Sequence, residues 1–349
     1  MNKYNSLPED KAITLKDIAE ESGYSIKTVS RAIHNHPDIN KTTRKIIMEI
    51  VKKYNYSPNW AAQSLRSKKT HTIGFVIPNI TNGYFGHVGL SIDRLFRENH
   101  YSTLICFTSN NHENEIESLN ALMNKNVDGI IFAPVGCEGD YYNRVPGLAK
   151  KPLVLIDNIC RGIDGSYVLH DNSHGASLLV KHLFNHGHTK IACVTGPVEE
   201  TSGAERLQGY KNALRNCGLP LDETLIKITN WEINGGNGAV LDLFSSSSKK
   251  PTAIFFANHQ LLLGGYKALH KLGLSIPGDV AVVSFDPPHV IDALSPRPTT
   301  LENFEEKIGS AAANLLLDLI SKKREIKENK IRVQGVLRIG ASCGCKSDF

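Results

Sequence analysis

Short apolar runs recur along the chain from residue 73 onward, and the segments between them have the periodicity of amphipathic helices. The runs are Ile73–Ile77, Thr103–Phe107, Gly129–Phe132, Leu153–Ile156, Ile191–Val194, Ala253–Phe256 and Val280–Phe285. Because they are nearly continuous rather than alternating, they are typical of strands buried on both faces. Apolar helical faces are formed by Ala176, Leu179, Val180, Leu183 and Phe184, by Phe85, Val88, Ile92, Leu95 and Phe96, and by Ile308, Ala312, Leu315 and Leu319. This alternation predicts a parallel α/β fold, and seven or more such units exceed one compact sheet, so we expect two lobes.

The segment 14–33 has a different pattern, in which two short helices are joined by a tight turn. One face of the first helix carries Leu15, Ile18 and Ala19, and one face of the second carries Val29, Ala32 and Ile33. Gly23 permits a left-handed turn between them, and Ser25 can cap the second helix. A third helix, about Lys41–Tyr54, is expected to turn Ile46, Ile47, Ile50 and Val51 inward. This is the helix-turn-helix pattern, in which the second helix enters the DNA major groove; an ordinary helical hairpin is the alternative.

The distribution of charge favours the DNA-binding interpretation. Residues 1–70 contain 13 Lys and Arg and 7 Asp and Glu, a net charge of +6, whereas the whole chain of 349 residues has a net charge of +5. All of the excess positive charge is therefore in the first fifth of the chain. A basic module on a nearly neutral body points to nucleic acid as the first partner to consider, although basic segments are often only solvated surfaces.

Candidate DNA contacts lie mainly on the second helix, where the residues predicted to be exposed are Ile26, Lys27, Thr28, Ser30 and Arg31. Lys27 and Arg31 are one turn apart and could donate to guanine O6 and N7, and Ile26 suits a thymine methyl group. Hydroxyl groups suited to phosphate contacts belong to Ser25, Thr28, Ser30 and Thr43. The candidate set also includes Thr14, Leu15 and Asn59.

Residues 58–70 are predicted to form a linker. Ser57 followed by Pro58 is a good helix start, because serine can cap a helix and proline fits its first position. Only a short helix can follow before the polar run Ser67–Thr72, and an isolated helix of that length is marginal in water. We therefore expect this segment to be helical only when something docks against it.

Two N-terminal segments, TLKDIAEESGYSIKTVSRAI and INKTTRKIIMEIVKKYNYSPNWAAQSLRS, resemble the DNA-binding headpiece and hinge of the lac-repressor/galactose-repressor family. The resemblance continues through THTIGFVIP, NHGHTKIACVTGP, ERLQGY, FFANHQ, SFD and SCG. It implies an extension at 1–13, a helix-turn-helix headpiece at 14–57 and a hinge helix at 58–70. It also implies that 71–349 is a two-lobed effector-binding and dimerisation domain, similar to periplasmic sugar receptors. In the family, a hinge leucine wedges between base pairs in the minor groove, and the matching residue is Leu65.

Polar residues directly follow three of the predicted strands, namely Asp157, Asn258 and Asp286. Ligands bind at the carboxyl ends of parallel strands, so these residues could share one crevice, although Asp and Asn are also common turn formers. The resemblance implies that Arg206 and Trp231 belong to the same effector site. We expect the other lobe to contribute Asn79, Tyr84 and Phe85.

These side chains favour a neutral sugar as the effector. Arg, Asp and Asn can hydrogen-bond vicinal hydroxyls, and an indole face packs against the C–H surface of a sugar. Glu199 and Glu200 disfavour an anionic ligand unless Arg206 offsets them.

Other function classes are not expected. The chain has no GxSxG, HExxH, P-loop or strand-following GxGxxG motif, which argues against an enzyme, and we expect no cofactor. We expect no metal either, because Cys343 and Cys345 have too few neighbouring partners for a tetrahedral zinc site. His182, His186 and His188 are interpreted as part of an ordinary helix-to-strand turn. The seven scattered cysteines are expected to be reduced thiols in the cytoplasm, and no apolar run is long enough to span a membrane.

We expect a homodimer on a near-palindromic operator, because one headpiece reads only half a site. Two alternatives stay open. The body alone would suit a transport-type receptor, and a phosphorylated protein could replace the sugar, as in global catabolite regulators of the family. Whether the effector weakens or strengthens DNA binding is also open.

Overall fold

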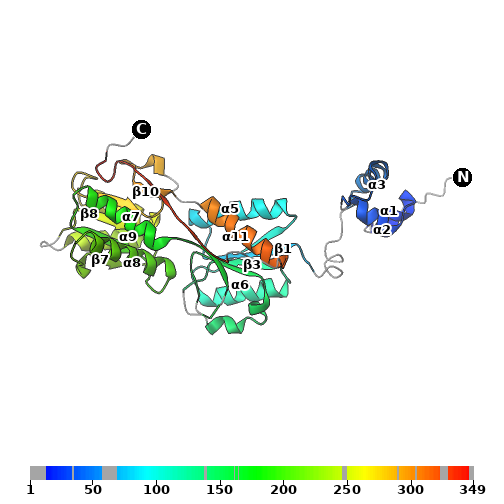
Figure 1. The fold of residues 1–349 in the computed structure, drawn as a ribbon, viewed down its shortest axis with the longest axis horizontal. Coiled ribbons are helices and arrows are strands. Elements are labelled where there is room, and N and C mark those ends of the chain that lie inside the picture. The colour runs from blue at the N-terminus through cyan, green and yellow to red at the C-terminus, as the bar shows by residue number, and fades with distance from the viewer. Residues whose placement is uncertain are drawn as a thin grey trace. The chain divides into compact units, whose positions relative to one another are not determined.

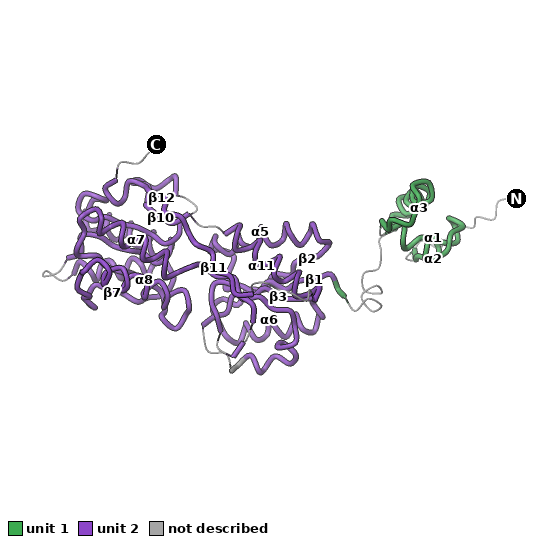
Figure 2. The backbone as a smooth tube through the Cα atoms, in the orientation of Figure 1, with its two compact units in different colours: residues 1–70 green, residues 71–349 purple. Residues whose placement is uncertain are grey.

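In the computed structural model the chain divides into two compact units, residues 1–70 and 71–349, which are coloured separately in Figure 2. The structure describes residues 13–33, 35–56, 69–136, 140–160, 162–163, 165–245, 250–288, 291–302, 305–322 and 329–345. Most of the predicted extension at 1–13 and of the predicted hinge at 58–70 lies outside the described residues, and both stay predictions.

The described residues of the first unit form three helices, α1 (Leu15–Ser22), α2 (Ile26–Ile33) and α3 (Lys41–Lys53) (Figure 1). Thr14 and Asp17 form a capping box at the start of α1, and Gly23, with φ of 72°, ends that helix in the left-handed conformation. The buried core consists of Ile18, Ala19, Val29, Ala32 and Ile47. The inward orientation predicted for Ile46 is wrong, since its side chain is 39% exposed. Adjacent helical positions point about 100° apart, and Ile47 occupies the buried face.

In the second unit, the strands that the structure describes form two six-stranded sheets. The first has the order β11-β5-β4-β3-β1-β2, with β1 (Thr72–Ile77), β2 (Ser102–Phe107), β3 (Gly129–Phe132), β4 (Leu153–Ile156), β5 (Ser166–His170) and β11 (Lys330–Val333). The second has the order β12-β10-β9-β8-β6-β7, with β6 (Ile191–Thr195), β7 (Ile226–Ile228), β8 (Ala253–Phe256), β9 (Ala281–Ser284), β10 (Thr299–Glu302) and β12 (Val336–Arg338). The described strand pairs are parallel except β10 with β12, which is antiparallel.

We call each sheet with its helices a lobe (Figure 1). Lobe 1 has α5 (Gly83–Glu98), α6 (His112–Asn124) and α11 (Glu305–Ile320); lobe 2 has α7 (Asn172–Asn185), α8 (Thr201–Asn216), α9 (Ile233–Ser245) and α10 (His259–Lys271). Short 3-10 helices are Asp140–Arg144, Leu148–Lys150, Glu223–Leu225 and Ile291–Ala293. The chain crosses between lobes after β5, after β10 and between β11 and β12. In lobe 1, α11 returns to pack on α5, and β12 then returns to the sheet of lobe 2. Each lobe is therefore built from separate parts of the sequence.

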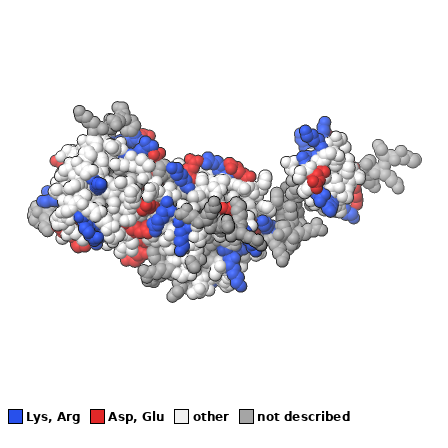
Figure 3. Space-filling model, in the orientation of Figure 1, with Lys and Arg blue, Asp and Glu red and all other residues white. Residues whose placement is uncertain are grey.

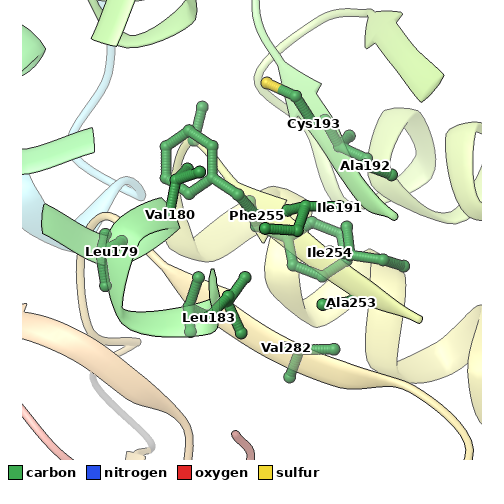
Figure 4. Close-up of a cluster of buried hydrophobic side chains, with 14 of the residues drawn as sticks. Leu179, Val180, Leu183, Ile191, Ala192, Cys193, Ala253, Ile254, Phe255 and Val282 are labelled. Atoms are coloured by element: carbon green, nitrogen blue, oxygen red, sulfur yellow. The ribbon is translucent and has the colours of Figure 1, made fainter. Parts of the chain in front are cut away.

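Apolar packing explains why the two lobes form. In lobe 2, Leu179, Val180 and Leu183 of α7 pack among side chains from β6 and β8 (Figure 4).

In lobe 1, the strand β2 is not buried on both faces as its sequence predicts, because it is the edge strand of its sheet. Ile105 and Phe107 are therefore 45% and 46% exposed. Among the described helices, none combines the length and apolar character needed to cross a membrane.

Candidate functional site

A pocket of about 570 Å³ lies within the second unit and is lined by residues of both lobes. The eight candidate effector residues all line it: Asn79, Tyr84, Phe85 and Asp157 from lobe 1, and Arg206, Trp231, Asn258 and Asp286 from lobe 2. Its volume is within the usual range for small-molecule sites, about 300–1,000 Å³. The carboxyl ends of the strands bring these residues together, since Asp157 follows β4, Asn258 follows β8 and Asp286 lies just beyond β9.

Arg206 is held rigidly at the pocket by contacts to its guanidinium group. Nε donates to Asn172 Oδ1 at 2.9 Å and Nη1 donates to the carbonyl of Ala257 at 2.5 Å. The guanidinium carbon lies 3.8 Å from the centre of the Phe285 ring, a cation–π contact. Because two of its donors are fixed by the protein, Arg206 can offer the remaining ones to a ligand without reorganising.

Asp286 is held by two hydrogen bonds from one residue. Oδ1 accepts from the backbone amide of His259 at 3.0 Å, and Oδ2 lies 2.7 Å from His259 Nδ1. Burial alone would raise the pKa of Asp286, but the charge and hydrogen bond of His259, together with the charges of Arg206 and His170, hold the pKa below its ordinary value. The pocket therefore contains a stable carboxylate paired with a histidine.

Two other acidic groups of the pocket have raised pKa values. Burial raises the pKa of Glu200 to about 7, and it raises the pKa of Asp157 to about 6 although Arg206 acts in the opposite direction. Trp231 Nε1 donates to Glu200 Oε2 at 2.6 Å, which fixes the indole against the pocket wall. Gly196 permits this placement, because a Cβ there would lie 2.1 Å from Trp231 Cε2.

Tyr84 has a buried hydroxyl group with no hydrogen-bond partner among the described residues. Tyr84 lies in the first turn of α5. Asn82 caps this helix, and its side-chain oxygen accepts a hydrogen bond from the Tyr84 backbone amide at 3.1 Å. Since buried polar groups are usually paired, an unpaired hydroxyl on a pocket wall is a natural partner for a ligand.

Polar contacts join the two lobes beside the pocket. Asn158 Oδ1, in lobe 1, accepts from the Ser202 amide of α8 at 3.2 Å. Arg332 of β11 makes two parallel hydrogen bonds to Glu205 of α8, at 2.7 and 2.8 Å. A ligand that changes the separation of the lobes must change these contacts, so they provide a means to couple pocket occupancy to lobe arrangement.

Sequence reasoning missed several pocket residues, including Asn158, His170 and Gln260. His170 ends β5, and burial lowers its pKa to about 4, so it is neutral at pH 7. No motif distinguished these residues from ordinary strand ends and helix starts. A search for polar residues after every predicted strand would have found Asn158. It would have missed His170, because β5 itself was not predicted.

Among the residues that the structure describes, the candidate DNA contacts lie on α1, α2 and α3 or directly before α1 and α2. Ile26 and Lys27 are exposed on α2, while Leu15 packs against the core. Several polar candidates are partly engaged within the protein: Thr14 caps α1, the Ser25 and Thr28 hydroxyls lie 2.9 Å apart, Arg31 lies 3.8 Å from Asp38, and the Thr43 amide donates to Asn40. Ser30 is half-buried on α2. Figure 3 shows Lys and Arg side chains at the surface of this unit. Asn59 and Leu65 lie outside the described residues.

The expectation that Cys343 and Cys345 have too few neighbouring partners for a tetrahedral zinc site is wrong. Their sulfur atoms lie 3.1 Å apart, and Cys345 Sγ is 2.9 Å from His186 Nε2 and 3.6 Å from His182 Nε2. The fold brings the C-terminal segment onto α7, and this proximity could not be anticipated from residues so far apart in sequence.

Both units of the chain match known protein families. Residues 14–59 match the family model described as bacterial regulatory proteins, lacI family, and residues 180–343 match a periplasmic binding protein-like domain. The chain is 29% identical to the ribose operon repressor of Escherichia coli (strain K12), over 93% of this chain and 98% of that protein. It is 30% identical to catabolite control protein A of Priestia megaterium, over 89% and 93%. The fold resembles the crystal structure of the lac repressor dimer bound to operator and the anti-inducer ONPF, with a TM-score of 0.83, 22% identity and coverage of 95% and 99%.

Proposed function

We infer the function from one premise: this chain belongs to the lacI family of bacterial regulatory proteins, which are DNA-binding transcriptional regulators controlled by small molecules. We propose that its effector is a neutral, polyhydroxylated molecule, most simply a sugar, bound in the pocket between the lobes. The first unit reads DNA in the cytoplasm, the chain acts as a homodimer on a near-palindromic operator, and it has no catalytic role.

The pocket side chains support a neutral ligand. Arg206 supplies donors, Asp286 supplies acceptors, and Asn258 can supply both, which suits vicinal hydroxyl groups. With pKa values of about 6 and 7, Asp157 is mostly ionised and Glu200 about half ionised at pH 7, so a bound phosphate would be repelled or would have to force protons onto them. A neutral hydroxyl has no such cost and can donate a hydrogen bond to either carboxylate. Trp231 offers an aromatic surface for the C–H face of a sugar ring. The single observation that carries the proposal is this convergence of eight candidate residues on one pocket.

Control of DNA binding follows from linkage. A ligand that binds one lobe arrangement better shifts the equilibrium toward it, and the DNA-binding unit responds only if that arrangement changes its affinity for DNA. The contacts of Asn158 with Ser202 and of Arg332 with Glu205 cross between the lobes and would differ between the two arrangements.

A thermal-shift panel of neutral sugars, sugar phosphates and nucleobases tests the effector class. A ligand at 100 times its Kd stabilises the folded protein by about 2.7 kcal/mol, which raises the melting temperature measurably. We expect a neutral sugar to stabilise the protein more than the phosphate ester of the same sugar does. A response to nucleobases or phosphate esters alone would contradict it.

A phosphorylated carrier protein is the second candidate, because catabolite control protein A is among the relatives. A binding assay with such a carrier, phosphorylated and unphosphorylated, separates the two candidates. Retention of the phosphorylated form, with no response to any sugar, would favour the protein co-effector.

A further inference from the structure

Four potential metal ligands from distant parts of the sequence meet at the surface of lobe 2. His182 lies in the last turn of α7 and His186 is its C-cap, so the two imidazoles are one helical turn apart. Cys343 and Cys345 come from the C-terminal segment after β12. The donor atoms of His182, Cys343 and Cys345 all lie within 4.8 Å of one another, and His186 Nε2 is 2.9 Å from Cys345 Sγ.

The spacing of these atoms is close to that of a tetrahedral site. With zinc–sulfur and zinc–nitrogen bonds of about 2.3 and 2.0 Å, ligand atoms stand about 3.3–3.8 Å apart. The two sulfur atoms are 3.1 Å apart, and Cys345 Sγ lies 3.6 Å from His182 Nε2. Shifts of about 1 Å would therefore bring the donor atoms of His182, Cys343 and Cys345 to coordination distances, and His186, in contact with Cys345, would supply the fourth ligand.

The ligands are also oriented by the surrounding protein. His186 Nδ1 lies 2.8 Å from the carbonyl of His182, which places the ring proton on Nδ1 and leaves the Nε2 lone pair toward Cys345. Thr299 Oγ1 lies 3.0 Å from Cys343 Sγ, where its hydroxyl can donate to a thiolate. Such contacts to the outer atoms of ligands are characteristic of zinc sites.

We propose that His182, His186, Cys343 and Cys345 bind one zinc ion as a structural site. Two thiolates with two imidazoles form a ligand set that selects zinc among the common divalent cations. Four protein ligands leave no open coordination position, so the ion fastens the C-terminal segment to α7 and has no catalytic task. This inference does not depend on the identity of the effector.

A disulfide between Cys343 and Cys345 is the competing interpretation. A disulfide bond is about 2.05 Å long, shorter than the 3.1 Å between these sulfur atoms. A disulfide would also leave the positions of the two histidines unexplained. A zinc site accounts for all four side chains.

The test uses the full-length protein without a histidine tag, purified with a phosphine reductant. Its zinc content is measured by mass spectrometry before and after chelation, and the chelated protein is titrated with Co²⁺. The variants are Cys345→Ser and His186→Ala. Their matched controls are Cys217→Ser, a half-buried cysteine at the end of α8, and His270→Ala, an exposed histidine in the last turn of α10.

We expect one zinc per wild-type chain, and with Co²⁺ a thiolate charge-transfer band together with the intense visible bands of a tetrahedral site. Both site variants should lose at least about 100-fold in zinc affinity, more than is typical for loss of an outer contact, while the controls retain it. Zinc should raise the melting temperature of the chelated wild type and not that of the site variants. The proposal is overturned if the reduced protein binds no zinc, if the site variants bind it as well as the controls do, or if another metal occupies the same four ligands.

Discussion

The indole of Trp231 donates a hydrogen bond of 2.6 Å to Glu200, a carboxyl group whose pKa burial raises to about 7. Trp231 precedes α9 and Glu200 precedes α8, so the bond joins two loops of lobe 2 at the pocket wall. Because the carboxyl group titrates near neutral pH, both the charge of the pocket and the environment of the indole change in the physiological range.

Replacing Glu200 with Gln tests this raised pKa. Between about pH 4.5 and 7 the folded wild type retains a proton on Glu200 that the unfolded chain has released, so the wild type should lose stability relative to Glu200→Gln as the pH rises. The slope should stay below about 1.4 kcal/mol per pH unit, since Glu200 is partly exposed. Urea unfolding of both proteins across this range measures it. The exposed neighbour Glu199, changed to Gln, is the control, and parallel pH profiles for wild type and Glu200→Gln would refute the assignment.

Removing the Tyr84 hydroxyl should have opposite effects on the free protein and on the complex. In the free protein that hydroxyl is buried without a partner among the described residues, so Tyr84→Phe should leave the stability unchanged or raise it by up to about 1 kcal/mol. The effector should bind about 5- to 10-fold more weakly, because one hydrogen bond contributes about 1 kcal/mol.

Tyr210 provides the matched control, because its hydroxyl donates to the carbonyl of Ile191 at 2.8 Å. Tyr210→Phe should lower stability by about 1 kcal/mol and leave effector affinity unchanged. Calorimetric titration and thermal unfolding measure both quantities. If Tyr84→Phe behaves like Tyr210→Phe, the Tyr84 hydroxyl does not contact the effector.

A methyl group at Gly196 should change the shape of the pocket by displacing the Trp231 side chain. An alanine Cβ would lie 2.1 Å from Trp231 Cε2, so Gly196→Ala must displace the indole and should weaken effector binding by at least about 10-fold. Gly238, exposed in α9, has nothing within 4 Å of such a Cβ, and Gly238→Ala should raise stability by about 0.5–1 kcal/mol without affecting binding. Tryptophan fluorescence and titration calorimetry distinguish the two; equal affinities would show that Trp231 is not a binding surface.

Lys27 tests the DNA-reading surface. Lys27→Ala should cost about 1–3 kcal/mol of specific affinity and relax the sequence preference at one or two positions, since Lys27 is exposed on α2. Lys52→Ala, at the exposed end of α3, removes the same charge from another helix and should not alter sequence preference. In vitro selection with random DNA measures both. An unchanged preference for Lys27→Ala would exclude a base contact by this residue.

The sequence predicted the regular parts of the fold because those parts depend on local patterns. Runs of buried apolar residues marked β3, β4 and β8 at their observed limits. The strand β5, by contrast, mixes Ser166 and His170 with apolar residues, and β11 alternates with exposed Lys330. Local pattern could not separate such strands from loops, nor show that α11 returns to lobe 1.

The pocket was predictable to the extent that its residues follow strands or match family motifs. Asp157, Asn258 and Asp286 met the first condition, and Arg206 and Trp231 the second. His259 met neither, because its hydrogen bonds to Asp286 depend on how β8 and β9 lie side by side. The cluster of His182 with Cys343 was missed for the same reason, since contact between distant segments is a property of the tertiary fold.

The most direct test of the account is the affinity of the full-length protein for its selected DNA, measured by fluorescence anisotropy with and without the sugar that gives the largest thermal shift. We expect saturating sugar to change the dissociation constant by about 5- to 150-fold in the wild type, the usual range of allosteric coupling, and to have no effect on Arg206→Ala. An unchanged dissociation constant in the wild type, with the pocket saturated, would contradict the claim that this pocket controls DNA binding.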